Sequence, residues 1–133
     1  MTQEDKMLLI KDLSSRLPYA VHVQHISGVS GILPDISIYH KYDENDNIYD
    51  AICYTDFLGD GDSITIEHFK PYLFPLSSMT EEQEKEYNNL NCYELGCFPH
   101  SEEALDYLTK NHFDYRHLIE KGLAIDATGL NIY

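Results

Sequence analysis

The stretch IYDAICYTDF, residues 48–57, decides the predicted fold because its alternating positions are apolar or aromatic on both faces. That pattern is typical of a strand covered on two sides. Three shorter runs, 19–24, 32–42 and 64–67, alternate between apolar and polar residues and are separated by turn-forming residues. We therefore expect an antiparallel meander of about four strands, with residues 48–57 as its central strand. Pro34 restricts the run 32–42 to an edge position or a late start.

Helix signals lie on both sides of these runs. Thr2 and Asp5 fit a helix start, and apolar residues then recur at helical spacing from Met7 to Leu17, where Pro18 follows. No crossover helix interrupts the predicted strands. This order of elements favours an α+β fold over a parallel doubly wound sheet.

After residue 69, an extended connector, KPYLFPLSSM, leads to further helix signals. Starts at Thr80, Ser101 and Asp114 predict three C-terminal helices, and Gly122 is placed to end the last one in a left-handed conformation. The predicted fold class is therefore α+β, with an N-terminal helix, an antiparallel meander of about four strands and three C-terminal helices packed on the sheet.

The length of 133 residues suits one domain, residues 1–133, with a single core. The sequence shows neither an internal repeat nor a linker long enough to divide domains. Its first residues lack the cationic start and apolar run of a targeting segment. The number of cysteines is three, and an odd number does not favour a disulfide framework. We expect a cytoplasmic protein with reduced thiols.

Charge is the most unusual property of the chain. The chain has nine lysine and arginine residues and 23 aspartate and glutamate residues, and its formal net charge is -14. Residues 43–109 hold sixteen of the acids but only Lys70 and Lys85 as bases. This balance disfavours direct binding of nucleic acids or of membrane surfaces. The acidic middle is interpreted either as a solvated rim or as a docking surface for a basic protein partner.

Eleven tyrosines interleave with the acidic middle. Their rings could simply pack in the core, but tyrosine also suits a surface that is both apolar and wet. The sharper hypothesis is a binding patch for arginine- or lysine-rich partners. Its predicted members are Tyr39, Tyr42, Asp43, Glu44, Asp46, Tyr49 and Asp50.

A weak calcium candidate lies in DFLGDGDSITIE, residues 56–67. Its acidic residues are Asp56, Asp60, Asp62 and Glu67. Part of the twelve-position calcium loop is matched, but Leu58 replaces an oxygen ligand and Ser63 replaces an apolar anchor. An ordinary hairpin turn is the favoured interpretation, and no other metal site is predicted.

Motifs for catalysis are missing from the sequence. There is no nucleophile elbow, no phosphate-binding glycine loop and no zinc spacing among the seven histidines. We therefore predict no catalytic residue and no cofactor. A small enzyme remains an alternative, and it would need a concave pocket with a desolvated titratable side chain.

Three segments carry a family resemblance: RLPYAVHVQ at 16–24, KPYLFPLSSMTEEQ at 70–83 and NHFDYRHLIEKGLAIDA at 111–127. They resemble a family of small uncharacterised proteins from gut bacteria and their phages or mobile elements. The resemblance implies a bacterial or phage cytoplasmic setting and transfers no catalytic residue.

The sequence therefore favours a non-enzymatic binding or regulatory module for a basic protein partner. The main alternative is a DNA-mimicking anti-defence protein of a phage or mobile element. The two differ in the arrangement of carboxylates, because a DNA mimic needs a long exposed row. A protein-docking patch instead needs a compact acidic rim around aromatic residues.

Overall fold

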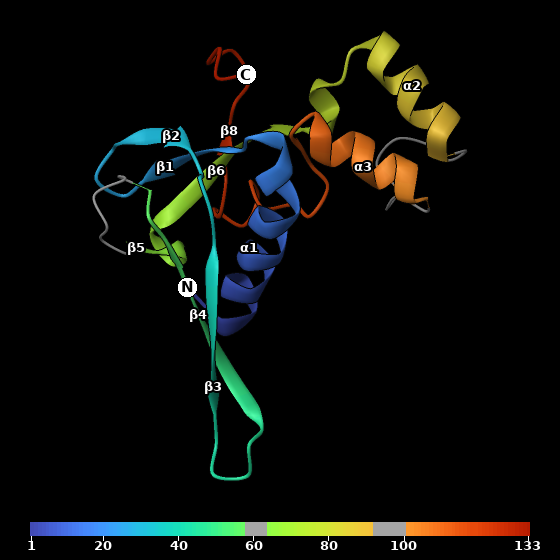
Figure 1. Cartoon of the computed structure of the whole chain (residues 1–133). Helices are drawn as coiled ribbons and strands as arrows, with labels where there is room; N and C mark the ends of the chain where they lie inside the picture. Colours follow the sequence, from blue (N-terminus) through green and yellow to red (C-terminus); the bar gives the residue numbers. More distant parts are fainter. Residues whose placement is uncertain (58–63, 92–100) are drawn as a thin grey trace. The chain divides into compact units, whose positions relative to one another are not determined.

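The computed structural model describes residues 1–57, 64–91 and 101–133, without the side chains of residues 48–52 and 91. Its helices and strands are shown in Figure 1. In chain order they are α1 Gln3–Arg16, β1 His22–His25, β2 Ser30–Ile32, β3 Ser37–Tyr42, β4 Ile48–Thr55, β5 Ile64–Thr65, β6 Phe69–Pro75, α2 Glu81–Asn91, α3 Glu102–Lys110, β7 Phe113–Asp114 and β8 Ile125–Asp126. The chain forms two compact units, Met1–Phe69 and Lys70–Tyr133.

Helix α1 opens the first unit as the sequence predicts. The Thr2 hydroxyl accepts a hydrogen bond from the backbone N–H of Asp5 at 3.1 Å, which caps the helix start. The helix ends where a 3-10 turn, Leu17–Tyr19, carries Pro18. Its buried face supplies Leu9, Ile10 and Leu13 to the core of this unit. The other buried members of that core are Val21, Val23, Leu33, Cys53, Ile66 and Phe69.

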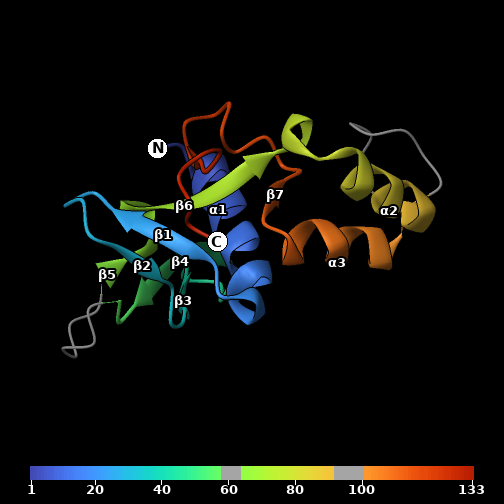
Figure 2. The same cartoon turned by 90° about the horizontal axis from the view of Figure 1, so that it is seen from above.

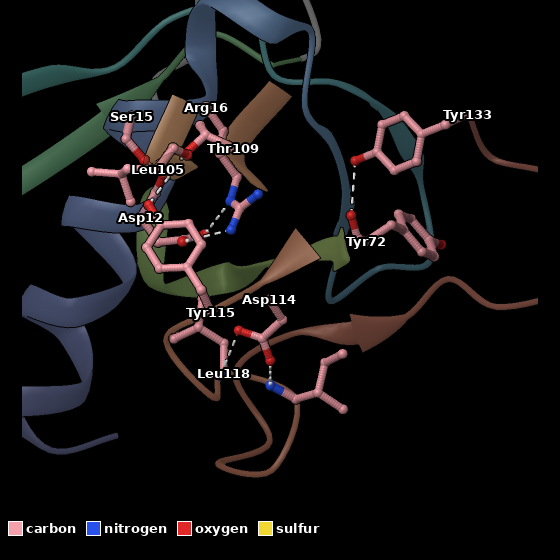
Figure 3. Close-up of polar contacts among 11 residues, drawn as sticks. Asp12, Ser15, Arg16, Tyr72, Leu105, Thr109, Asp114, Tyr115, Leu118 and Tyr133 are labelled. Carbon is pink, nitrogen blue, oxygen red and sulfur yellow. Dashed lines mark hydrogen bonds and ion pairs between the residues drawn. The ribbon is translucent and has the colours of Figure 1, made fainter. Parts of the chain in front are cut away.

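A buried ion pair lies on the same helix, one turn apart (Figure 3). The Arg16 guanidinium donates to both Asp12 carboxylate oxygens, from Nε at 2.8 Å and from Nη2 at 3.1 Å. Both side chains are fully buried. Because desolvation of the two ions opposes their attraction, such a pair contributes little net stability but is costly to break.

The strands of the first unit form two separate antiparallel pairings. β1 pairs with β2 through a turn in which Gly28 has φ +95°, and β3, β4 and β5 form a three-stranded sheet in that order. β4 is therefore central, as predicted, and β3 starts late at Ser37, after Pro34. The prediction of one continuous meander was wrong. The run 32–42 breaks after Ile32, so its first residue belongs to β2 and its later ones to β3.

In the second unit, β6 forms where the sequence predicted an extended connector. It pairs in parallel with β7, with Phe74 opposite Phe113 and Pro75 opposite Asp114. It also pairs in parallel with β8, through Tyr72 and Leu73. Helices α2 and α3 lie between β6 and β7 in the chain, so this part of the fold contains a parallel pairing with a helical crossover that the sequence analysis did not predict.

Helices α2 and α3 lie side by side (Figure 2) and share the second buried cluster. That cluster consists of Tyr87, Ala104, Leu108, Phe113 and Tyr115. Both predicted helix starts are confirmed. Gln83 N–H donates to the Thr80 hydroxyl, Thr80 N–H donates to the Gln83 side-chain oxygen, and the Ser101 hydroxyl accepts from the N–H of Ala104.

The predicted fourth helix does not form: residues 115–124 are turns and bends, and the described part of the chain holds three α-helices. The local caps are nevertheless present. The Asp114 carboxylate (Figure 3) accepts hydrogen bonds from the N–H groups of Leu118 and Ile119, both at 2.9 Å. Gly122 has φ +73°. The physical reason for the difference is His117, whose φ of +59° interrupts helical backbone geometry.

Within the described residues, no helix combines the length and the apolar character that crossing a lipid bilayer requires.

Candidate functional site

The hairpin of β3 and β4, which we name the β3–β4 ribbon (residues 37–55), projects past α1 in the first unit (Figure 1). All six residues of β3 are exposed, so neither face of this strand is covered by the core. Cys53 and Thr55 of β4, at the other end of the ribbon, are buried. The ribbon is thus an arm with an anchored base and an exposed outer part.

The base of the ribbon is held by one carboxylate. Asp35 Oδ1 accepts hydrogen bonds from the Thr55 hydroxyl at 3.0 Å and from the Asp56 N–H at 3.2 Å. These bonds join Asp35, two residues before β3, to the end of β4. They fix the direction in which the ribbon leaves the core.

The tip of the ribbon is a turn organised by Asp43. Its Oδ1 accepts from the N–H groups of Asn45 and Asn47, both at 2.9 Å, and its own N–H donates to the Asn47 carbonyl at 2.9 Å. The backbone N–H groups of Asn47 and Asn45 lower the pKa of Asp43, because they stabilise its charged form. Asp46 completes the turn with φ +62°. The Asp43 carboxylate is therefore ionised at neutral pH, and Glu44 and Asp46 lie exposed beside it.

The tyrosines of the predicted patch lie on this arm. Tyr39 is 62% and Tyr42 56% exposed, and the Tyr39 ring makes an edge contact with Tyr54 at a centroid separation of 5.9 Å. Asp50 is opposite Lys41 in the strand register, and Tyr49 lies in β4, but their side chains are outside the described residues. The alternative that the tyrosines serve the core holds for a different set, namely Tyr72, Tyr87 and Tyr115.

The calcium candidate is only partly within the described chain. Asp60 and Asp62 lie outside it, Asp56 donates its N–H to Asp35, and Glu67 Oε1 lies 3.8 Å from Lys6 Nζ. Among the described residues, no three His, Cys, Asp or Glu side chains are grouped so that they could hold a metal ion. The calcium site stays a prediction.

Sequence reasoning missed a concave site in the second unit. We name it the β6–β7 pocket; its volume is about 270 Å³. One wall comes from the end of β6 and the residues after it, namely Pro75, Leu76 and Ser77. The other comes from Asp114 at the end of β7 and from His117, Ile119 and Glu120 in the turn that follows. The sequence did carry the Asp114 cap, but it gave no sign that Asp114 pairs with Pro75.

The polar groups of this pocket differ in burial. The Asp114 side chain is almost fully buried and both of its oxygens accept backbone N–H groups. Glu120 is exposed, and its Oε1 lies 3.9 Å from His117 Nδ1. A buried carboxylate beside a pocket is what the enzyme alternative requires, but this carboxylate already holds the turn together.

Comparison with known proteins finds no matching family model, no similar curated protein and no similar solved structure. The resemblance to a gut-bacterial and phage family stays a prediction.

Proposed function

We propose that this chain is a non-enzymatic binding or regulatory module, and that it docks a basic protein partner on the β3–β4 ribbon. The observation that carries the proposal is the exposure of every β3 residue, combined with an ionised acidic turn at the end of the same arm.

Exposure of the ribbon has an energetic cost that a partner would relieve. A two-stranded hairpin without a covering layer is marginally stable in water. Ile38, Tyr39 and Tyr42 nevertheless stay at least 45% exposed. Burial of apolar area contributes roughly 25 cal/mol per Å², so covering these three side chains would stabilise a complex. Tyrosine is suited to this role because its ring buries well while its hydroxyl keeps a polar partner.

The charge of the ribbon defines the class of partner. Residues 37–55 contain four acids, Asp43, Glu44, Asp46 and Asp50, and a single lysine, Lys41, with no arginine. The described acids of the tip lie within four successive residues at one end of the arm. Such a compact group beside aromatic side chains supports a protein-docking patch, and it gives no support to the long acidic row that a DNA mimic needs. Arginine suits this surface because it pairs with carboxylates and stacks on aromatic rings.

The edge of β3 offers a second recognition element. In the described sheet, β3 has β4 on one side and is the outer strand. An extended peptide segment can add to such an edge through main-chain hydrogen bonds, while its side chains determine specificity. A basic segment in extended conformation is therefore the partner that fits both the edge and the tip.

Association kinetics with an arginine-rich peptide test this proposal. Changing Asp43→Asn, Glu44→Gln and Asp46→Asn together removes three charges, and the asparagine at 43 can still accept the turn hydrogen bonds. We expect a several-fold slower association at low salt and a weaker salt dependence, because steering by charge acts on the association rate. The matched control carries Glu81→Gln, Glu82→Gln and Glu84→Gln on α2. Equal slowing in both triple variants, or in neither, would overturn the proposal.

A further inference from the structure

The β6–β7 pocket arises from the way two parallel strands end. β6 and β7 pair in parallel, with Pro75 opposite Asp114, and both strands end at these residues. The carboxyl ends of parallel strands meet at one edge, and the chains that follow them diverge. Here the 3-10 turn Leu76–Ser78 leaves β6, while the turn capped by Asp114 leaves β7. The crevice between the two departing segments is the pocket.

The walls of the pocket combine apolar surface with negative charge. Pro75, Leu76 and Ile119 supply the apolar surface, and the carboxylates of Asp114 and Glu120 supply the charge. No lysine or arginine is among the lining residues, and His117, beside Glu120, is the only basic group there. Anionic ligands such as phosphates would therefore meet repulsion in this pocket, whereas a cation would meet attraction.

The volume narrows the ligand class further. At about 270 Å³ the pocket lies just below the range of roughly 300–1,000 Å³ that is usual for drug-sized ligands and cofactors. It suits a single long side chain or a small amine. Lysine and arginine have this form, because their apolar stems lie along apolar surface while the charged group stays near polar partners.

We propose that the β6–β7 pocket binds a cation carried on an apolar stem, namely the alkylammonium or guanidinium group of the lysine and arginine class. The stem lies against Leu76 and Ile119, and the cation faces Glu120 at the rim. Asp114 contributes its negative charge from the pocket wall, while its oxygens stay on the N–H groups of Leu118 and Ile119. The pocket is independent of the β3–β4 ribbon, which belongs to the other unit.

The decisive experiment compares two probes on the unmodified protein. Nα-acetyl-lysine amide and Nα-acetyl-norleucine amide share the apolar stem, but only the first carries a charge. In NMR titrations we expect saturable shifts of the Leu76 and Ile119 methyl groups with the lysine probe, and at least fivefold weaker binding of the norleucine probe. Equal binding of both probes, or no saturable shift at millimolar concentration, would overturn the proposal.

Two variants with the same charge change locate the site. Glu120→Gln is expected to weaken binding of the lysine probe about two- to fivefold, the size of effect typical of an exposed ion pair. Glu103→Gln, on the exposed surface of α3, is expected to leave it unchanged. Equal weakening in both variants would show attraction by net charge alone and would contradict a defined pocket.

Cadaverine distinguishes two possible ligands of the pocket, a free small amine and a lysine side chain presented by a peptide. Tighter binding of this free diamine than of the blocked lysine probe would indicate a small amine as the ligand. Tighter binding of the lysine probe would indicate a side chain presented by a peptide. Both results are consistent with a cation site, and failure of both probes would remove it.

Discussion

Two turns in this molecule use the same chemistry in opposite surroundings. At the ribbon tip, Asp43 accepts from two backbone N–H groups in full contact with water. In the second unit, Asp114 accepts from two backbone N–H groups while it is almost fully buried. The buried carboxylate mainly stabilises the fold. The exposed one keeps its charge accessible and mainly serves recognition.

A third carboxylate marks the extreme of burial. Changing Asp12→Ala removes from the fully buried Arg16 guanidinium the carboxylate that it contacts at 2.8 and 3.1 Å. Breaking a buried pair in this way costs about 3–5 kcal/mol, so the largest loss in the free energy of unfolding is expected here. Urea denaturation followed by circular dichroism measures it. If Asp12→Ala lowered the free energy of unfolding less than the removal of an exposed carboxylate does, the role assigned to burial would be contradicted.

Asp114→Ala is expected to have the next largest effect. It leaves the N–H groups of Leu118 and Ile119 without their acceptor, and an unsatisfied buried donor costs about 1–3 kcal/mol. The same denaturation measurement applies. Asp114→Asn, which retains one acceptor oxygen, should lose less. Equal losses in the two variants would indicate that the hydrogen bonds are not the cause.

Tyr107 tests a carboxylate contact of intermediate exposure. Burial, and then the hydrogen bond and charge of Glu86, raise the pKa of Tyr107 to about 12. Because the folded-state pKa lies above the ordinary value of about 10, the stabilisation is complete below pH 10 and is lost as the pH rises toward 12. Ultraviolet titration of Glu86→Gln should show a lower Tyr107 pKa than the unchanged protein. An unchanged value would rule out the contribution of Glu86.

Asp43 is expected to give the smallest change in stability. Its lowered pKa means that it stabilises the turn at pH values above the ordinary carboxyl pKa, and that this contribution is lost as the pH falls through the lower folded-state value. Carboxyl-carbon NMR should place its titration below that of an ordinary aspartate. Asp43→Ala should destabilise the protein less than Asp114→Ala. The reverse order would contradict the comparison between the two turns.

Sequence patterns predicted local features better than long-range pairing. The caps at Thr2, Thr80 and Ser101 and the central position of β4 are set by neighbouring residues, and the structure confirms them. The sequence predictions failed where the structure depends on pairing between segments that are distant in the chain. The segment 70–75 looked like a connector because its parallel partners lie about 40 and 50 residues further along the chain.

The candidate sites divide in the same way. Residues 39–46 of the ribbon are close in sequence, so the grouping of their tyrosines and acidic residues could be predicted from the sequence alone. The β6–β7 pocket depends on Pro75 meeting Asp114, and no local pattern contains that contact. The positive φ of His117 was equally unpredictable, because such a backbone angle at a histidine follows from tertiary surroundings and not from helix-capping signals.

The most direct measurement of the central claim is amide hydrogen exchange with and without an arginine-rich peptide. If the β3–β4 ribbon is the docking surface, the amides of Ser37–Tyr42 become more protected when the peptide is added, while those of the acidic helix α2 do not change. Unchanged exchange along β3, or equal protection along α2, would contradict the proposed function.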